Sequence, residues 1–360
     1  MSFDKEKPFN DLPVLPPEGE LETKLILKKV IDARAALASL DASNKRLPNE
    51  SLLANAVILQ EAKLSSEIEN IVTTNDALYQ SLALENLTDP NLKEVISYSK
   101  ALWLGYKFVG ENGFISTRIL IDMMQVIKET GVGIRKIPGT KISNHVTGEI
   151  VYTPPEGEDV ILEKLKNLEQ YINNKNDTID PLVKMSVMHY QFESIHPFHD
   201  GNGRTGRILN IIFLVLSGLI KNPILYLSKY IVENKNDYYN KLRGVTERGE
   251  WEQWIVYMLS AVEETAKYTE KKIQDICVLM ETTAQTIKKE SPRIYSKELV
   301  DALFKLPYCK RKFLVDAGIV KDKTAGKYLM ELEKVGILKA EKVGREKLYF
   351  NKAFFDLLRK

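Results

Sequence analysis

Residues 196–207 place groups that can bind an anion next to groups that can move a proton. Gly201-Asn202-Gly203 puts little side-chain bulk at the junction between a loop and a predicted helix start. Backbone N–H groups at such a start can face an anion, and the helix dipole favours negative charge there. Arg204 and Arg207 are three residues apart and therefore share one face of the first turn. Two guanidiniums beside a helix N-terminus suit a di- or triphosphate.

Asp200 and His196 add the chemistry that a phosphate transfer needs. Asp200 comes directly before the glycines and is a hard oxygen ligand, as a magnesium ion that bridges phosphates requires. His196 lies one short loop upstream and is a candidate general base near neutral pH. Each feature alone is common at helix starts. Together, within one short segment, they predict nucleotidyl or phosphoryl transfer to a hydroxyl.

The segments around this loop are predicted to be helices that position it. Residues 178–195 form an apolar helical pattern with Pro181 in its first turn, and residues 204–220 form a second one. Residues 134–155 lack a helical period and are rich in β-branched residues, Gly and Pro, which predicts a β-hairpin. Further helical patterns make the predicted fold mainly α; they cover residues 23–40, 51–71, 76–87, 91–131, 161–172, 236–245 and 251–262.

Residues 196–207 resemble, position by position, the Fic motif HPFx[DE]GNGRxxR. The resemblance implies a Fic-type helical core that transfers AMP from ATP to Ser, Thr or Tyr hydroxyls of proteins. It implies that His196 deprotonates the target hydroxyl and that Asp200 binds Mg²⁺. The backbone of residues 201–203 and the Asn202 side chain would form the anion hole. Arg204 would hold the β-phosphate and Arg207 the γ-phosphate.

The rest of the motif refines this assignment. Pro197 and Phe198 would shape the loop, His199 receives no role, and Thr205 and Gly206 complete the expected ATP-binding segment. The kinase-like branch of the family replaces the glycine found here at Gly203 with a lysine-type residue, so the resemblance favours transfer of AMP over transfer of phosphate.

Two further segments resemble parts of the same family. Residues 134–155 match the flap, which pairs with the backbone of a target protein as an added strand. Tyr238 and Tyr239 lie in a segment that resembles the region packing on adenine, although either ring can equally belong to the core. His189, on the apolar helix, is interpreted as a structural histidine.

Ser65–Asn70 match a second pattern of the family, [ST]xxxE[GN]. Ser65 and Glu69 are four residues apart and therefore share one face of a helix. In the proteins it resembles, this glutamate pairs with the last arginine of the motif, here Arg207, and mimics the γ-phosphate. The resemblance implies that the chain inhibits itself through Glu69.

Composition sets the outer limits of the interpretation. The 360 residues are 44% apolar and 28% charged, which excludes a largely disordered chain. The two cysteines, Cys277 and Cys309, have no partner at metal-ligand spacing, so a disulfide framework or zinc site is not expected. No apolar stretch reaches the roughly 20 residues of a membrane span, and the opening residues lack the apolar core of a signal peptide. We therefore expect a soluble, cytoplasmic protein.

The net charge of +2 is unevenly distributed. Residues 291–360 hold 17 basic and 9 acidic side chains, a net charge of +8, so the rest of the chain carries −6. Three predicted helices and a hairpin that turns at residues 343–345 resemble a winged helix-turn-helix, a small α+β domain. Basic side chains gather on its third helix and hairpin: Lys323, Lys327, Lys334, Lys339, Lys342, Arg345 and Lys347. They could contact DNA phosphates, or they could only keep a small protein-binding domain soluble.

The sequence thus predicts four regions: residues 1–110, helical with the inhibitory helix; 111–260, the catalytic core; 261–290, a linking helix; and 291–360, winged-helix-like. Expected partners are MgATP, a target protein on the flap, the chain itself as a target, a second copy in a homodimer, and DNA. Two alternatives stay open. The enzyme can also remove AMP, with Glu69 positioning a water, or the chain is a DNA-binding regulator whose core senses a nucleotide. An intact His196 and Asp200 argue against the second, because binding alone needs no base.

Overall fold

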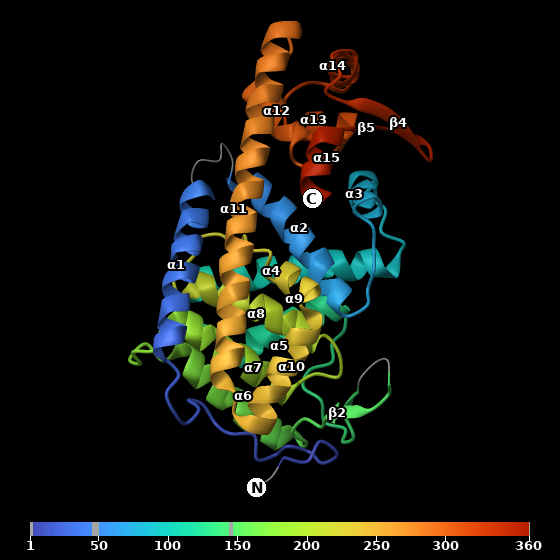
Figure 1. Ribbon diagram of the computed structural model, residues 1–360. Coiled ribbons are helices and arrows are strands. Elements are labelled where there is room, and N and C mark those ends of the chain that lie inside the picture. The colour runs from blue at the N-terminus through green and yellow to red at the C-terminus, as the bar shows by residue number, and fades with distance from the viewer. Residues whose placement is uncertain (1–2, 45–49, 144–146, 360) are drawn as a thin grey trace.

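Helices form most of the chain in the computed structural model, which describes residues 3–44, 50–143 and 147–359. Figure 1 shows the helical body with the N-terminus at its lower end and a small C-terminal region at its upper end. The helices of the body are α1 (Lys24–Asn44), α2 (Glu50–Ile68), α3 (Asn75–Leu84), α4 (Pro90–Asn112), α5 (Thr117–Lys128), α6 (Glu158–Asn173), α7 (Pro181–Ile195), α8 (Asn202–Leu216), α9 (Leu227–Glu233), α10 (Lys235–Arg248) and α11 (Trp251–Glu290).

Local sequence explains where several of these helices begin. The side chains of Thr74, Ser116 and Asp180 each accept a hydrogen bond from a backbone N–H in the first turn of the helix that follows. Such N-caps satisfy donors that a helix start leaves without a partner. Asp180 is followed by Pro181 at the first helical position, where a missing N–H has no cost. The prediction that Pro181 lies in the first turn of the helix before the motif is therefore confirmed, while the helix begins at Pro181 rather than at residue 178.

α8 lies at the centre of the body and is buried along almost its whole length. Its neighbours are α2, α4, α5 and α7. A helix that is apolar on all sides needs such enclosure, which explains the apolar run of residues 208–216. In the described part of the chain, no helix is both long and apolar enough to cross a membrane. The N-terminus of α8 carries the motif, so a deeply buried helix of the body holds the predicted site.

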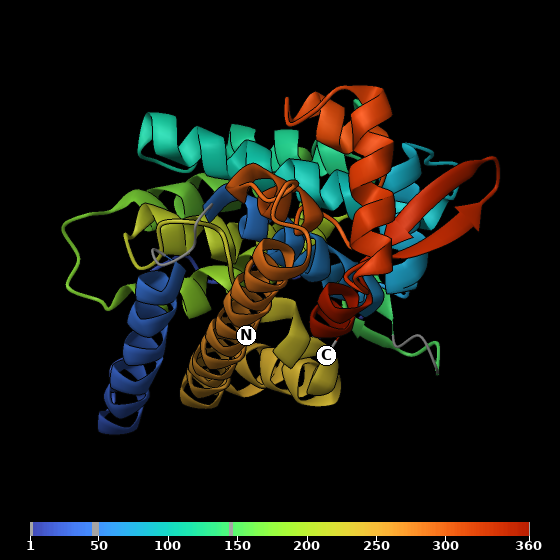
Figure 2. The same cartoon turned by 90° about the horizontal axis from the view of Figure 1, so that it is seen from above.

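α11 connects the body to the C-terminal region. α1 packs along it, and the two helices lie side by side in Figures 1 and 2. The C-terminal region contains α12 (Lys297–Leu303), α13 (Arg311–Asp316), α14 (Asp322–Lys334) and α15 (Lys352–Arg359). Its sheet has the antiparallel order β3-β5-β4, with β3 (Tyr308–Cys309), β4 (Lys339–Val343) and β5 (Glu346–Phe350).

The mainly helical prediction, with a hairpin and a small C-terminal α+β region, is confirmed. Two elements of that region, β3 and α15, were not predicted from the sequence. β3 has only two residues, and α15 comes directly after β5. Two predicted boundaries fall inside continuous helices, the one at 110/111 in α4 and the one at 260/261 in α11. A composition shift cannot locate such a boundary, because a long helix can belong to two packing units at once.

The predicted hairpin forms the second sheet, in which β1 (Ile142–Ser143) pairs antiparallel with β2 (Ile150–Tyr152). Part of the predicted flap, residues 144–146, lies outside the described residues, as do residues 45–49 in the predicted break between the first two helices. Residues 3–9, near the N-terminus, pack beside β2: the Phe3 ring stacks on Tyr152, and the Phe9 N–H donates to the Thr153 carbonyl at 3.0 Å.

Candidate functional site

His196 terminates α7 in the left-handed conformation, with φ 48° and ψ 58°. Its N–H donates to the Phe192 carbonyl at 3.1 Å, which closes the last turn of the helix. A non-glycine residue in this conformation is unfavourable by about 1 kcal/mol, so its surroundings must hold it there. The bend starts the loop that leads to α8.

Arg135 holds this loop in place and was not identified from the sequence. Its Nε donates to the His196 carbonyl at 2.8 Å, and its guanidinium also reaches the carbonyls of Ile195 and Pro155. Its backbone N–H donates to the Pro197 carbonyl at 2.9 Å. The side chain is only 2% exposed. A single arginine in a hairpin segment gave no signal for this role, because its partners are backbone carbonyls distant in sequence.

Asn202 fixes the other end of the loop. Its Oδ1 accepts from the Phe198 N–H at 2.9 Å, and its Nδ2 donates to the Phe198 carbonyl at 2.8 Å. We expected this side chain in the anion hole. Its oxygen and one N–H of its amide thus bind the loop, and the amide has a second N–H, so a part for Asn202 in the anion hole stays a prediction beside the backbone N–H groups at the start of α8. Phe198 is 1% exposed and anchors the loop in the core.

Glu69 lies at the start of α8, although it comes from the end of α2. Its Oε1 accepts from Arg207 Nη2 at 2.8 Å. A β-carbon built on Gly203 would collide with the same Glu69 oxygen and would lie 2.9 Å from Arg207 Nη1. The carboxylate therefore rests on the bare backbone of the first helical turn, where the helix dipole favours an anion.

Ser65 binds the same guanidinium from the same helix. Arg207 Nε donates to Ser65 Oγ at 2.7 Å, and Arg207 Nη2 donates to the Ser65 carbonyl at 2.9 Å. Arg207 is 1% exposed, so these three bonds replace the water that burial removes. The predicted pair of Ser65 and Glu69 thus converges on Arg207. α2 ends at Ile68, so Glu69 stands just beyond the helix rather than within it.

The charges of this pair reinforce each other. Burial alone would raise the pKa of Glu69, but the adjacent Arg207 outweighs it and holds that pKa below its ordinary value. Burial alone would lower the pKa of Arg207, but Glu69 and Glu193 outweigh it and raise that pKa. Both groups are therefore charged near neutral pH.

His196 stays neutral. Burial, and next the positive charge of Arg135, lower its pKa to about 4. Its Nδ1 is buried and has no hydrogen-bond partner. A neutral imidazole can accept a proton, as a general base must.

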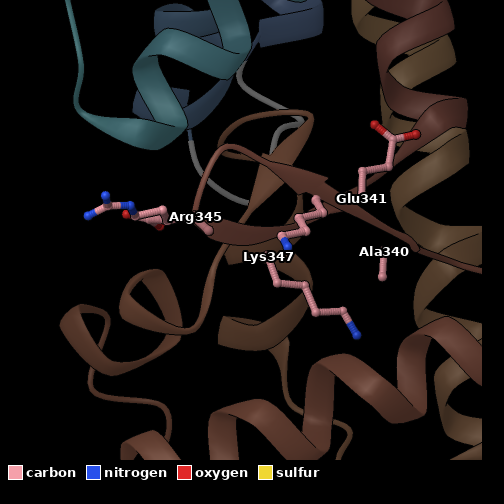
Figure 3. A pocket seen from close by; sticks show the side chains of 6 residues that line it. Ala340, Glu341, Arg345 and Lys347 are labelled. Atoms are coloured by element: carbon pink, nitrogen blue, oxygen red, sulfur yellow. The ribbon is translucent and has the colours of Figure 1, made fainter.

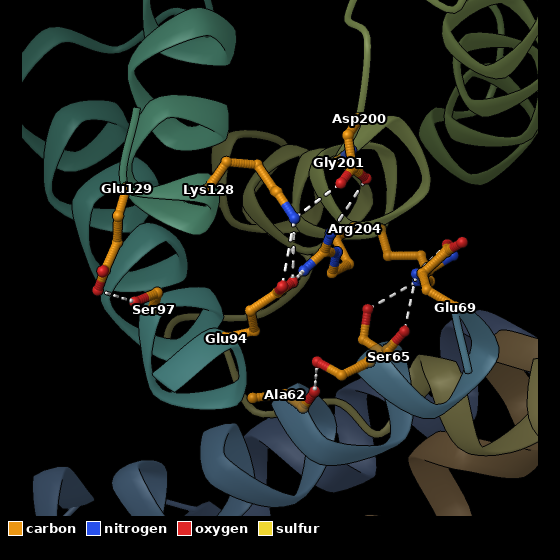
Figure 4. Close-up of polar contacts among 12 residues, drawn as sticks. Ala62, Ser65, Glu69, Glu94, Ser97, Lys128, Glu129, Asp200, Gly201 and Arg204 are labelled. Carbon is orange, nitrogen blue, oxygen red and sulfur yellow. Dashed lines mark hydrogen bonds and ion pairs between the residues drawn. The ribbon is translucent and has the colours of Figure 1, made fainter. Parts of the chain in front are cut away.

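Asp200 and Arg204 form a second charged cluster at the site. Arg204 is 1% exposed and contacts Asp200 Oδ1 at 3.3 Å. It also pairs with Glu94 of α4, while Lys128 of α5 lies 2.7 Å from Asp200 Oδ2. Figure 4 shows these four side chains together, with Ser65 and Glu69 on the other side of Arg204. Glu94 and Lys128 were not identified from the sequence, because nothing in their spacing relates them to the motif.

Asp200 fits the magnesium role that the resemblance implies. Its side chain is 61% exposed, so a hydrated ion can reach it. Among the described residues, no group of three or more His, Cys, Asp or Glu side chains could hold a metal ion alone. Magnesium is commonly held by one or two carboxylates together with substrate phosphates and water, so one aspartate suffices.

The two predicted adenine residues occupy different surroundings. Tyr238 is 2% exposed, and its hydroxyl lies 2.8 Å from His189 Nε2. Its ring packs near Trp254 and Tyr257, so Tyr238 belongs to the core. Tyr239 is 45% exposed and remains available to a ligand. His189 is fully buried and stacked on Trp254, as a structural histidine would be.

A hollow on the C-terminal hairpin lies apart from the motif and contains none of its residues (Figure 3). It is lined by Glu341, Lys342, Arg345, Glu346 and Lys347 of β4, β5 and their turn. Its lining mixes three basic with two acidic side chains, and the acids do not favour a polyphosphate. The candidate site is therefore the N-terminus of α8.

Comparison with known proteins agrees with this geometry. Three family models match in chain order: the Fic/DOC family N-terminal model at residues 27–107, the Fic/DOC family model at 114–214, and the C-terminal domain model of SoFic-like protein adenylyltransferases at 279–354. Together they cover most of the chain and include the whole motif.

Curated relatives and solved structures point the same way. Protein adenylyltransferase fic-1 of Caenorhabditis elegans is 31% identical over 37% of this chain and 24% of its own length. A probable protein adenylyltransferase of Aquifex aeolicus is 28% identical over 48% of this chain and 52% of its own length. The matches thus span about a quarter to a half of these relatives.

Among solved structures, a Fic family protein from Desulfovibrio desulfuricans superposes with a TM-score of 0.59 at 17% identity, covering 93% of this chain and 98% of that one. Fic-1 of C. elegans superposes with a TM-score of 0.52 at 24% identity, covering 71% and 75%. These likenesses show the fold. With three successive models matched and the motif assembled at the start of α8, the chain belongs to the Fic/DOC family.

Proposed function

We propose that the chain is a protein adenylyltransferase that transfers AMP from MgATP to hydroxyls of proteins and restrains itself through Glu69. The observation that carries the proposal is the position of the Glu69 carboxylate. It lies on Gly203 and Arg207 at a helix N-terminus, in a site that also holds a neutral histidine. A carboxylate in that position stands where a phosphate would bind. The activities named for the relatives support the same reaction.

The reaction follows from what each group can do. Neutral His196 accepts the proton of a target Ser, Thr or Tyr hydroxyl, and the freed oxygen attacks the α-phosphorus of ATP. The bond between the α-phosphorus and the oxygen that bridges to the β-phosphate breaks, and diphosphate leaves. Backbone N–H groups at the start of α8 stabilise the negative charge that gathers on the α-phosphoryl group. Arg204 and Arg207 bind the departing phosphates.

Asp200 would hold Mg²⁺ in this reaction. The ion would neutralise phosphate charge and orient the leaving group. Arg135 and Asn202 keep His196 and the loop in one geometry, because both bind loop backbone atoms.

Inhibition follows from the same contacts. While Glu69 occupies Arg207, the γ-phosphate loses its predicted partner, and ATP binds in a non-productive pose. Arg207 keeps two bonds to Ser65 when Glu69 leaves, so the guanidinium stays in place for the phosphate.

Purified protein with α-labelled ATP tests the proposal. Glu69→Gly protein should label itself or proteins of its own cell lysate, and Glu69→Gly with His196→Ala should not, although its ATP affinity stays nearly unchanged. Labelling that survives loss of His196 would contradict the assignment. Loss of AMP from labelled protein only when Glu69 is present would instead identify the reverse reaction. The labelled peptides would identify the target residues.

The partners named by the resemblance remain part of this proposal. A target protein would add a strand to the flap near β1 and β2. Tyr239 would contact adenine, with Thr205 and Gly206 lining the ATP site. A homodimer, DNA binding by the C-terminal region and a cytoplasmic setting remain predictions.

A further inference from the structure

Glu94 and Lys128 lie at the phosphate site but belong to neither motif. Glu94 comes from α4 and Lys128 from the end of α5, and both meet the start of α8 (Figure 4). Lys128 Nζ lies 3.2 Å and 3.4 Å from the two Glu94 carboxylate oxygens. The same ammonium lies 2.7 Å from Asp200 Oδ2, and Glu94 Oε2 pairs with Arg204 Nη1. Each side chain therefore touches its partner and one residue of the motif.

The charges of these contacts match the charges of the expected ligands. Arg204 serves an anion, and the group on it here is a carboxylate. Asp200 serves a cation, and the group on it here is an ammonium. The methylene groups of Lys128 also lie close to the Gly201 backbone before α8, since a β-carbon on Gly201 would lie 3.4 Å from Lys128 Cγ.

We propose that Glu94 and Lys128 compete with MgATP for the phosphate site, Glu94 with the phosphate on Arg204 and Lys128 with the cation on Asp200. This inference rests on the proposed function. It adds a second internal competitor, independent of Glu69, which acts on the other arginine of the motif.

The arrangement makes the exchange of partners inexpensive. When MgATP takes Arg204 and Asp200, Glu94 and Lys128 are already within salt-bridge distance of each other and keep that pairing. Their side chains are 29% and 23% exposed, so water can replace the lost contacts. Arg204 is different: it is 1% exposed and its Nε has no partner, so it needs an anion in every state.

An opposite role, in which Glu94 orients Arg204 for the phosphate, predicts the opposite sign. Competition means that removing the Glu94 charge strengthens ATP binding, whereas orientation means that it weakens ATP binding. The measurement is calorimetric titration of ATP in EDTA against Glu69→Gly protein with and without Glu94→Gln. We expect the second change to tighten binding by about fivefold, the effect of a partly exposed ion pair.

Glu129→Gln is the matched control for charge. Glu129 lies next to Lys128 in sequence and contacts Ser97 of α4 at 3.2 Å, but no contact with Arg204 is seen for it. If Glu129→Gln tightens ATP binding as much as Glu94→Gln does, the effect is long-range charge and the inference is wrong. Unchanged or weaker binding in Glu94→Gln also overturns it. If Glu69→Gly protein binds no ATP at all, the proposed function itself fails.

Lys128→Met gives an independent readout and keeps most of the stem over Gly201. Without the ammonium, Asp200 Oδ1 keeps its contact with Arg204 but Oδ2 is released for the ion, so Mg²⁺ should reach half of its full effect on ATP affinity at a concentration several-fold lower. Lys93→Met, on the exposed side of α4, is the control. An unchanged Mg²⁺ requirement in Lys128→Met, or an equal shift in the control, would show that Lys128 does not compete for Asp200.

Discussion

Replacing Glu69 by glycine should raise AMP transfer by at least about tenfold. The change removes one charge-assisted bond, from Arg207 Nη2 to Glu69 Oε1 at 2.8 Å. Such bonds contribute about 1.5–3 kcal/mol, and the 34% exposure of the Glu69 side chain places this one near the lower end. About 1.4 kcal/mol corresponds to tenfold in an equilibrium. The same change also empties the space above Gly203, which the carboxylate fills.

The assay is self-labelling with α-labelled ATP by five purified proteins: wild type, Glu69→Gly, Glu69→Gln, Arg207→Ala, and Glu69→Gly with Arg207→Ala. Glu69→Gln separates charge from bulk, because the amide keeps the size of the side chain and loses the charge. If the ion pair is the main restraint, Glu69→Gln should recover most of the gain. If the filled space is the restraint, it should stay close to wild type.

The gain should depend on Arg207, because the γ-phosphate needs the guanidinium that Glu69 releases. In the Arg207→Ala background the glycine change should therefore restore little. A Glu69→Gly protein no more active than wild type would refute the inhibitory role of the contact. A double variant as active as Glu69→Gly alone would show that inhibition does not work through Arg207.

Three further outcomes follow from the same contacts. The pKa of His196, about 4, lies below the ordinary histidine value near 6.5, so its ring signals in NMR should not titrate between pH 8 and pH 5, and a titration midpoint near 6.5 would contradict the burial of the ring. The stability that comes from burying the neutral ring should be lost as pH falls from about 6.5 through 4. Asn202→Ala should lower AMP transfer by roughly tenfold to a hundredfold with little change in ATP affinity, because it frees the Phe198 backbone and displaces His196. A proportional loss of ATP affinity would show instead that the Asn202 side chain contacts the bound nucleotide. If residues 291–360 bind DNA, gel-shift affinity should fall steeply with salt, and no shift at low salt would leave protein contact as their role.

The sequence predicted the chemistry of the site better than its surroundings. Residues 196–207 are contiguous, so their order along the chain fixes which of them meet at a helix start. The pairing of Glu69 with Arg207 crosses more than a hundred residues, and only the family resemblance predicted it; the bonds from Arg207 to Ser65 were not predicted. Spacing within α2 limits which residues share a face, but it does not say which helix that face meets.

The residues that were missed share one property. Arg135, Glu94 and Lys128 act through backbone carbonyls or through charges contributed by other helices. None of them stands at a fixed distance from the motif, so a single sequence carries no pattern for them. The bonds from Asn202 to the Phe198 backbone were not predicted for a related reason, since a carboxamide beside a glycine-rich turn can serve a ligand, the loop itself, or both.

The charge asymmetry of the chain has a structural component at the junction with the C-terminal region. Lys312 Nζ lies 2.7 Å from Glu85, at the end of α3, and the hydroxyl of Tyr308 in β3 bonds to Asp76 in its first turn. α3 is the next helix after Glu69 in the chain, so a basic residue of the C-terminal region is paired with an acid close in sequence to Glu69. The hairpin of β4 and β5 is different, because Lys342 and Arg345 are exposed at its tip. The basic residue Lys312, which pairs with α3, is thus separate from Lys342 and Arg345, which are exposed to a partner. The gel shift tests only the exposed residues of the hairpin.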